Sequence, residues 1–189
     1  MVGTLFTRTN HKHLNHGIPM AQKITDPLSF LTNLLTNKGK SDLYGIYLIG
    51  VNVLADCETD YGYDVSQSLA SSEVFQLLSR ESVEWNEILV ATRIGVHETV
   101  YPICFLRQRE PITVYFLTEG IEMSAMVFIP TLTVNEFVTE VTFYQHLLRE
   151  VALFAGKTPT SIRFTIGAVS MEWDEVVERG CAREVDVGF

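Results

Sequence analysis

The first candidate for chemistry is a thiol on an apolar segment. Cys104 lies in VYPICFL, residues Val100–Leu106, whose β-branched and aromatic content predicts a strand. A cysteine attacks an electrophile only as the thiolate, which cationic neighbours favour and apolar burial opposes. Two interpretations of Cys104 stay open: a catalytic nucleophile, or a buried core cysteine, which is the more frequent role of a thiol on an apolar strand.

Cationic and imidazole groups supply the other candidates. Arg107 and Arg109, in the run RQRE, form the best local anion site, although such a run is also typical of a charged hairpin loop. His11, His13 and His16 lie within six positions and could bind a metal. No cysteine or carboxylate lies among these three histidines, which favours a solvated or docked arm instead. We therefore expect no metal site.

Polar residues also occur one turn apart on the most strongly predicted helix. His146 precedes Glu150 by four residues, and Gln145 precedes Arg149 by four, so each pair shares one helix face. Buried together, these side chains would line a polar pocket. Left in solvent, they would form an ordinary hydrated strip, which is the commoner arrangement.

The helix that carries these residues has clear start and stop signals. Thr133 followed by Glu136 is a capping box, and Gly156 occupies the position of a C-terminal glycine. Between them, apolar residues recur at helical spacing over most of the circumference. The sequence predicts one long helix within Thr131–Gly156, covered on most sides by the rest of the chain.

Strands and shorter helices are predicted around this long helix. Ile112–Leu117 and Ile121–Ile129 form the clearest hairpin, with a turn at Thr118–Gly120, and in the first strand Tyr115 and Leu117 lie on the face opposite Ile112, Val114 and Phe116. We expect an α+β fold with a mixed sheet of about five or six strands packed on the long helix. The remaining predicted elements are helices at Leu28–Thr36, Asp64–Leu78 and Trp173–Val177, strands at Leu43–Leu54, Glu87–Ile94 and Ser161–Met171, and a loop at Lys157–Thr160.

Composition narrows the class of protein. The chain of 189 residues is 47% hydrophobic with a net charge of −9, which favours one globular domain, residues 25–189, after an arm at residues 1–24. With only 14 lysines and arginines, we expect no extended nucleic-acid surface. No apolar run reaches the ~20 residues of a membrane span. Three widely separated cysteines favour a reducing compartment such as the cytoplasm. Walker A, G-x-G-x-x-G, C-x-x-C and H-E-x-x-H motifs do not occur.

The order of elements from Ile112 to Asp174 resembles the C-terminal half of the thymidylate synthase and pyrimidine nucleotide hydroxymethylase family. The matching segments are ITVYFLTEG, IEMSAMVFI, NEFVTEVTFYQHLLREVA, AGKTPTSIRFTIG and AVSMEWDE. The resemblance implies a compact phage-type version of that fold and a homodimer, or a larger assembly, paired sheet against sheet. It also implies a pyrimidine nucleotide ligand, a folate cofactor and Cys104, in Pro102-Ile103-Cys104, as nucleophile.

The chemical motifs depart from that family. Ile129-Pro130-Thr131 and Asn86-Glu87 stand where the family has phosphate-binding arginines, and Glu140 stands near its base-reading residue. Ser170 and Glu172 replace its sugar-binding histidine and tyrosine. We therefore expect a non-catalytic relative without a cofactor, which binds a nucleotide-like ligand or a protein partner through residues such as Arg107, Arg109, Glu140, Ser170 and Glu172. Two alternatives stay open: an active hydroxymethylase or methylase with folate, and a structural assembly protein of a viral particle, which would be found in the virion or host cytoplasm.

Overall fold

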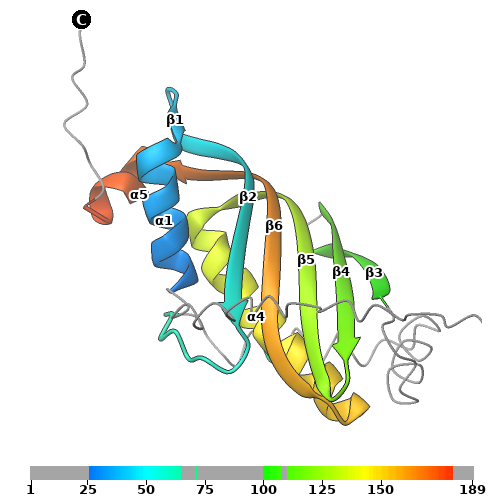
Figure 1. Ribbon diagram of the computed structural model, residues 1–189. Coiled ribbons are helices and arrows are strands. Elements are labelled where there is room, and N and C mark those ends of the chain that lie inside the picture. Colours follow the sequence, from blue (N-terminus) through cyan, green and yellow to red (C-terminus); the bar gives the residue numbers. More distant parts are fainter. Residues whose placement is uncertain (1–25, 65–70, 72–99, 108–109, 181–189) are drawn as a thin grey trace, which may run out of the picture.

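A computed structural model describes residues 26–64, 71, 100–107 and 110–180, with the backbone alone for 100–107, 110 and 111 (Figure 1). The arm at residues 1–24, the helix predicted at Asp64–Leu78, the strand predicted at Glu87–Ile94 and Arg109 therefore lie outside the described residues, apart from positions 64 and 71.

The described strands form one six-stranded sheet in the order β1-β2-β6-β5-β4-β3. β5 and β6 are parallel, and every other neighbouring pair is antiparallel. Together with the helices below, this confirms the α+β class with a mixed sheet. The strands are β1 (Lys40–Ser41), β2 (Gly45–Asp56), β3 (Val100–Arg107), β4 (Glu110–Glu119), β5 (Glu122–Thr133) and β6 (Thr158–Glu172).

Helix α4 (Val134–Ala155) connects the two parallel strands. A parallel pair needs such a crossover, because the chain must return to the same end of the sheet. Thr133 caps the helix: its hydroxyl accepts from the Glu136 backbone N–H at 3.2 Å, and its own N–H donates to the Glu136 carboxylate at 2.8 Å. Gly156 ends the helix with a φ of 65°, a backbone conformation that favours glycine. Both predicted caps are confirmed.

One face of the sheet packs against α4 and forms the core. Alternate strand residues, such as Val53, Val114, Val127 and Phe164, are buried on that face, and Phe164 makes an edge-on ring contact with Phe137 of α4. Helix α1 (Pro27–Lys38) packs on β2 and α4, burying Leu31 and Leu35. Its first turn is capped by Asp26, which accepts from the Ser29 N–H at 2.7 Å. The short helix α5 (Trp173–Glu178) follows β6.

Two predictions about elements were wrong in detail. Lys157–Thr160 is not a loop, because β6 begins at Thr158, whose N–H donates to the Ile121 carbonyl at 2.8 Å. Pro159, which has no N–H, is accommodated beside a register shift between Met123 and Ala125. The two-residue β1 was not predicted, since two residues carry no periodicity.

None of the described helices combines the length and hydropathy that crossing a bilayer requires.

Candidate functional site

The predicted catalytic region lies on the edge strand of the described sheet. The backbone of Cys104 in β3 is opposite Thr113 of β4, and Arg107 is opposite Glu110 at the end of the same pair. The structure describes only the backbone there, and Arg109 lies outside the described residues. The catalytic and anion-binding roles of these residues therefore stay predictions.

The other predicted ligand residues lie on two different elements. Glu140 is on α4, where its side chain is only 2% exposed. Ser170 is half-buried in β6, opposite Tyr47 and Thr133. Glu172 is exposed at the end of β6, and its N–H donates to the Glu175 carboxylate at 3.0 Å in the first turn of α5. None of these residues lines the recesses described below, and their binding role also stays a prediction.

The face of the sheet opposite α4, which we call the open face, is the most extended candidate surface. In the described part of the chain, α1 and α4 both pack on the core side (Figure 1). Because side chains alternate across a strand, the residues between the buried ones point to the open face. They are Asn52 and Leu54 of β2, Thr113, Tyr115 and Leu117 of β4, Ser124, Met126 and Phe128 of β5, and Ser161, Arg163 and Thr165 of β6.

The strand register arranges these side chains in rows across the open face. One row runs Leu54–Arg163–Met126–Tyr115, because each is opposite the next in the pairing. A second row runs Asn52–Thr165–Phe128–Thr113, and in it the Thr165 hydroxyl donates to the Asn52 side-chain oxygen at 3.0 Å. The sequence correctly placed Tyr115 and Leu117 on the face opposite the buried residues of β4.

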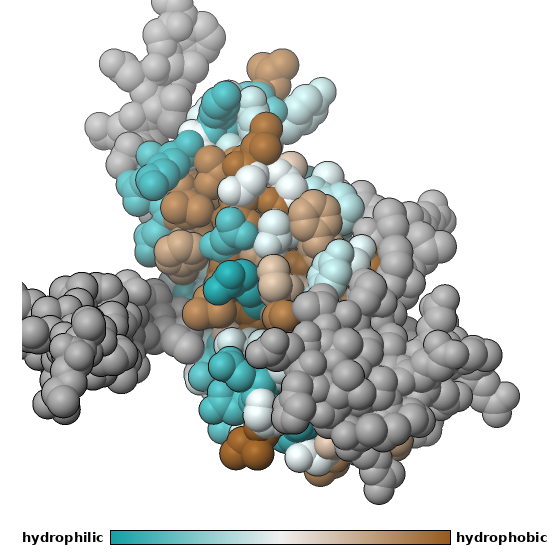
Figure 2. Space-filling view, turned by 45° about the vertical axis from the view of Figure 1, so that its right-hand side comes forward, coloured by the Kyte–Doolittle hydropathy of each residue, from teal (hydrophilic) through white to brown (hydrophobic). Residues whose placement is uncertain are grey.

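The open face exposes large apolar side chains. Phe128 is 47% exposed and Leu54 is 44% exposed, while Met126, Tyr115 and Leu117 are half-buried beside them. Figure 2 shows apolar and polar side chains interleaved on the side of the molecule that faces the viewer. Large apolar side chains gathered on one surface are typical of sites that bind another molecule.

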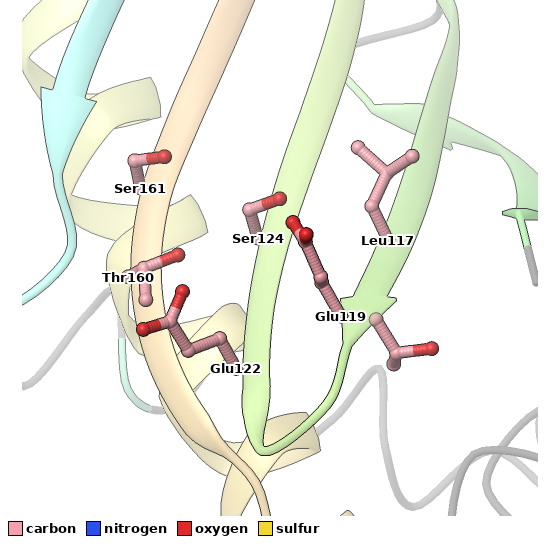
Figure 3. Close-up of a pocket in the computed structure, with 7 residues that line it drawn as sticks. Leu117, Glu119, Glu122, Ser124, Thr160 and Ser161 are labelled. Atoms are coloured by element: carbon pink, nitrogen blue, oxygen red, sulfur yellow. The ribbon is translucent and has the colours of Figure 1, made fainter. Parts of the chain in front are cut away.

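An acidic recess lies at one end of the open face, where the β4–β5 hairpin turns. Its volume is about 480 Å³. Figure 3 shows the Glu119 carboxylate extending toward Ser124, and the Glu122 carboxylate pointing toward β6 beside Thr160. The recess is lined by Leu117, Thr118, Glu119, Glu122, Ser124, Thr160 and Ser161.

Arg163 provides the opposite charge on the same face. It lies two residues beyond Ser161 on β6, so it points to the same side of the sheet as the recess. Its side chain is exposed, and among the described residues it makes no ion pair or hydrogen bond. The open face thus carries a cation in its middle and two carboxylates at its hairpin end.

The acidic recess was not predicted from the sequence, although part of its signal is local. Glu119 lies in the predicted turn and Glu122 stands two residues after it. Arg163 stands between Ile162 and Phe164 in SIRFTIG, which are buried, so alternation along the strand points its side chain to the other face. The grouping depends on the parallel pairing of β5 with β6 across the α4 crossover, which strand periodicity does not reveal.

No protein-family model matches the chain, and no curated protein matches it. The strand–turn–strand–helix–strand order behind the thymidylate synthase resemblance is present from Glu110 to Glu172. The resemblance itself stays a prediction.

Proposed function

We propose that this chain is a non-catalytic binding protein, and that its open face binds a second copy of the same chain. The observation that carries the proposal is the exposure of Phe128 and Leu54 on the face of the sheet opposite helices α1 and α4. Stable interfaces need about 800 Å² per partner with an apolar centre, and a broad sheet face with Phe128 and Met126 at its middle suits that requirement.

A two-fold pairing also matches the charges on the open face. In a two-fold interface the same surface is used twice, so each residue meets its counterpart in both directions. With the axis between Arg163 and the hairpin end, each Arg163 enters the other copy's acidic recess, beside Glu119 and Glu122. Complementary charges across an interface fix orientation more than they add affinity, so we assign register to this contact and affinity to the apolar rows.

The non-catalytic part of the proposal rests on the departures from the family's motifs at Ile129-Pro130-Thr131 and Asn86-Glu87. Cys57, the one cysteine whose side chain the structure describes, adds no candidate nucleophile. Burial raises the pKa of the Cys57 thiol to about 11, and its sulfur donates to the Gln145 carbonyl at 3.5 Å. A thiol in that state is a poor nucleophile at neutral pH.

The first test removes the apolar centre. Phe128→Glu places a charge in the middle of the proposed interface and is expected to weaken self-association about 30-fold or more, the effect of losing a residue worth ~2 kcal/mol. Leu153→Glu is the matched control, because Leu153 is an exposed apolar residue of α4, away from the open face. Sedimentation equilibrium measures both. Equal association of the two variants would argue against this face.

The second test reverses the charges. Arg163→Glu alone places three carboxylates at each proposed contact and should weaken the dimer. Adding Glu119→Lys and Glu122→Lys to Arg163→Glu should restore it, because the pairing is regenerated with opposite sign. Failure of the triple variant to recover, with the fold intact by circular dichroism, would remove the proposed register while leaving the apolar contact to be judged by Phe128→Glu.

A further inference from the structure

A second recess lies on the other side of the sheet, between α4 and the loop after β2. Side chains of α4 hold the loop: the Gln145 amide donates to the carbonyls of Asp56 at 2.7 Å and Thr59 at 2.9 Å, and Arg149 donates to the Cys57 carbonyl. The recess has a volume of about 150 Å³. It is lined by Thr59, Asp60, Tyr61, Tyr63, Thr142, Gln145, His146 and Arg149.

The wall of this recess consists of polar and aromatic side chains held in place by the fold. Thr142 and Gln145 line it although they are only 8% and 7% exposed, so polar groups have been buried at its wall. The Tyr61 and Tyr63 rings stack with centroids 5.4 Å apart, and the Tyr61 hydroxyl accepts from the Asp56 N–H at 2.7 Å. Of the two interpretations of the polar helix residues, the structure favours the pocket for Gln145, His146 and Arg149. Glu150 is exposed and does not line it.

We propose that this recess binds a small carboxylate of about six non-hydrogen atoms, held by Arg149 and His146. A guanidinium has five N–H donors, and among the described residues Arg149 uses one of its nitrogens, on the loop carbonyl. The remaining donors suit the two oxygens of a carboxylate, which arginine binds as a fork. The chain has a net charge of −9, so a cationic side chain at a polar recess is a local exception to the overall charge and favours an anionic ligand there.

His146 adds a second donor to the same site. Burial, and then the neighbouring Arg149, lower the pKa of His146, so the ring is neutral at pH 7 and has one N–H donor and one acceptor nitrogen. No described hydrogen bond occupies its ring nitrogens. The N–H can therefore be given to an anion that also contacts Arg149, one turn away on the same helix face.

The volume of the recess and the carboxylate of Asp60 narrow the class of ligand further. A cavity of about 150 Å³ is known to hold a molecule of benzene's size, which excludes an enclosed nucleotide. Asp60 also lines the recess, and one of its oxygens accepts from the Gly62 N–H at 2.9 Å, which leaves the other as an acceptor. A hydroxyl or ammonium group next to the carboxylate can use that acceptor, so the class is a small 2-hydroxy or 2-amino acid.

The test compares two probes of the same skeleton. Saturation-transfer NMR with L-lactate should show binding to the wild-type protein, whereas 1,2-propanediol, which lacks the carboxylate, should show none. Glycine tests the amino-acid branch of the class. If neither lactate nor glycine binds, or if 1,2-propanediol binds as well as lactate, the proposal is wrong.

Variants locate the bound probe. Arg149→Met should weaken lactate binding about tenfold or more, the usual effect of losing a charge-assisted hydrogen bond. Arg179→Met is the matched arginine control that should leave it unchanged, because Arg179 is an exposed residue after α5 and lines neither recess. Because Arg149 also holds the loop, His146→Leu provides a second variant that removes a donor and spares that contact. Lactate binding unchanged in His146→Leu would overturn the site, even if Arg149→Met fails to fold.

Discussion

At the scale of single residues, burial decides what a reactive group can do. Cys57 is fully buried, with a pKa of about 11, so only a very small fraction is thiolate at pH 7.5. We predict that iodoacetamide labels Cys57 slowly in the folded protein and rapidly in urea, as measured by mass spectrometry of its peptide. Rapid labelling of the native protein would mean that the thiol is accessible, and the packing described around Cys57 would be incorrect.

His146 predicts a pH dependence of stability. Its pKa in the folded protein is lowered from 6.5 by burial and by Arg149, with Glu150 opposing, while Asp60, Tyr61 and Tyr63 face it from the loop. Between the two pKa values the unfolded chain binds more protons, so this contribution to stability is present above pH 6.5 and is lost as the pH falls toward the folded pKa. His146→Gln should therefore reduce the drop in the urea midpoint between pH 7.5 and pH 5.5. An unchanged drop would show that the ring is not desolvated.

At the scale of elements, α4 gives the most direct stability prediction. Leu148 is fully buried on α4, and Leu148→Ala should lower the free energy of unfolding by about 2–5 kcal/mol through lost transfer energy and a cavity. Leu153→Ala is the control on the same helix, because Leu153 is 75% exposed and its truncation leaves no cavity. Urea denaturation measures both. Similar midpoints for the two variants would show that the buried face of α4 is wrongly assigned.

Elements with local signals were the ones that the sequence predicted well. Thr133, Glu136 and Gly156 determine the ends of α4 through contacts within a few residues, and alternation in β4 placed Phe116 and Tyr115 on opposite faces of the sheet. Sheet order is different, because pairing β2 with β6 joins segments more than a hundred residues apart. Nothing local encodes that pairing, so the acidic recess and the rows of the open face could not be predicted.

The recess beside α4 shows the same limit. The spacing of Gln145, His146 and Arg149 indicated a shared polar face, but the burial of that face depends on the loop after β2, nearly ninety residues earlier in the chain. No local pattern in the sequence indicates that Tyr61 and Tyr63 lie beside this face. Local spacing therefore predicted one wall of the site, and the tertiary contacts supply the other.

At the scale of the whole molecule, the proposed self-association depends on a sheet whose two faces differ. Helices α1 and α4 cover one face, while the open face carries exposed Phe128 and Leu54 on either side of Arg163. Two copies with a net charge of −9 repel each other at long range, so moderate salt should favour association by screening that repulsion. The apolar rows then supply the attraction at contact.

Light scattering coupled to size exclusion, at micromolar concentration in 150 mM salt, tests this central claim most directly. One chain has a mass of 21.3 kDa. If two chains associate through the open face, the wild-type protein has twice that mass. Phe128→Glu should reduce it to the mass of a single chain, whereas Leu153→Glu should not. A wild-type protein that stays at 21.3 kDa across the concentration range would contradict it.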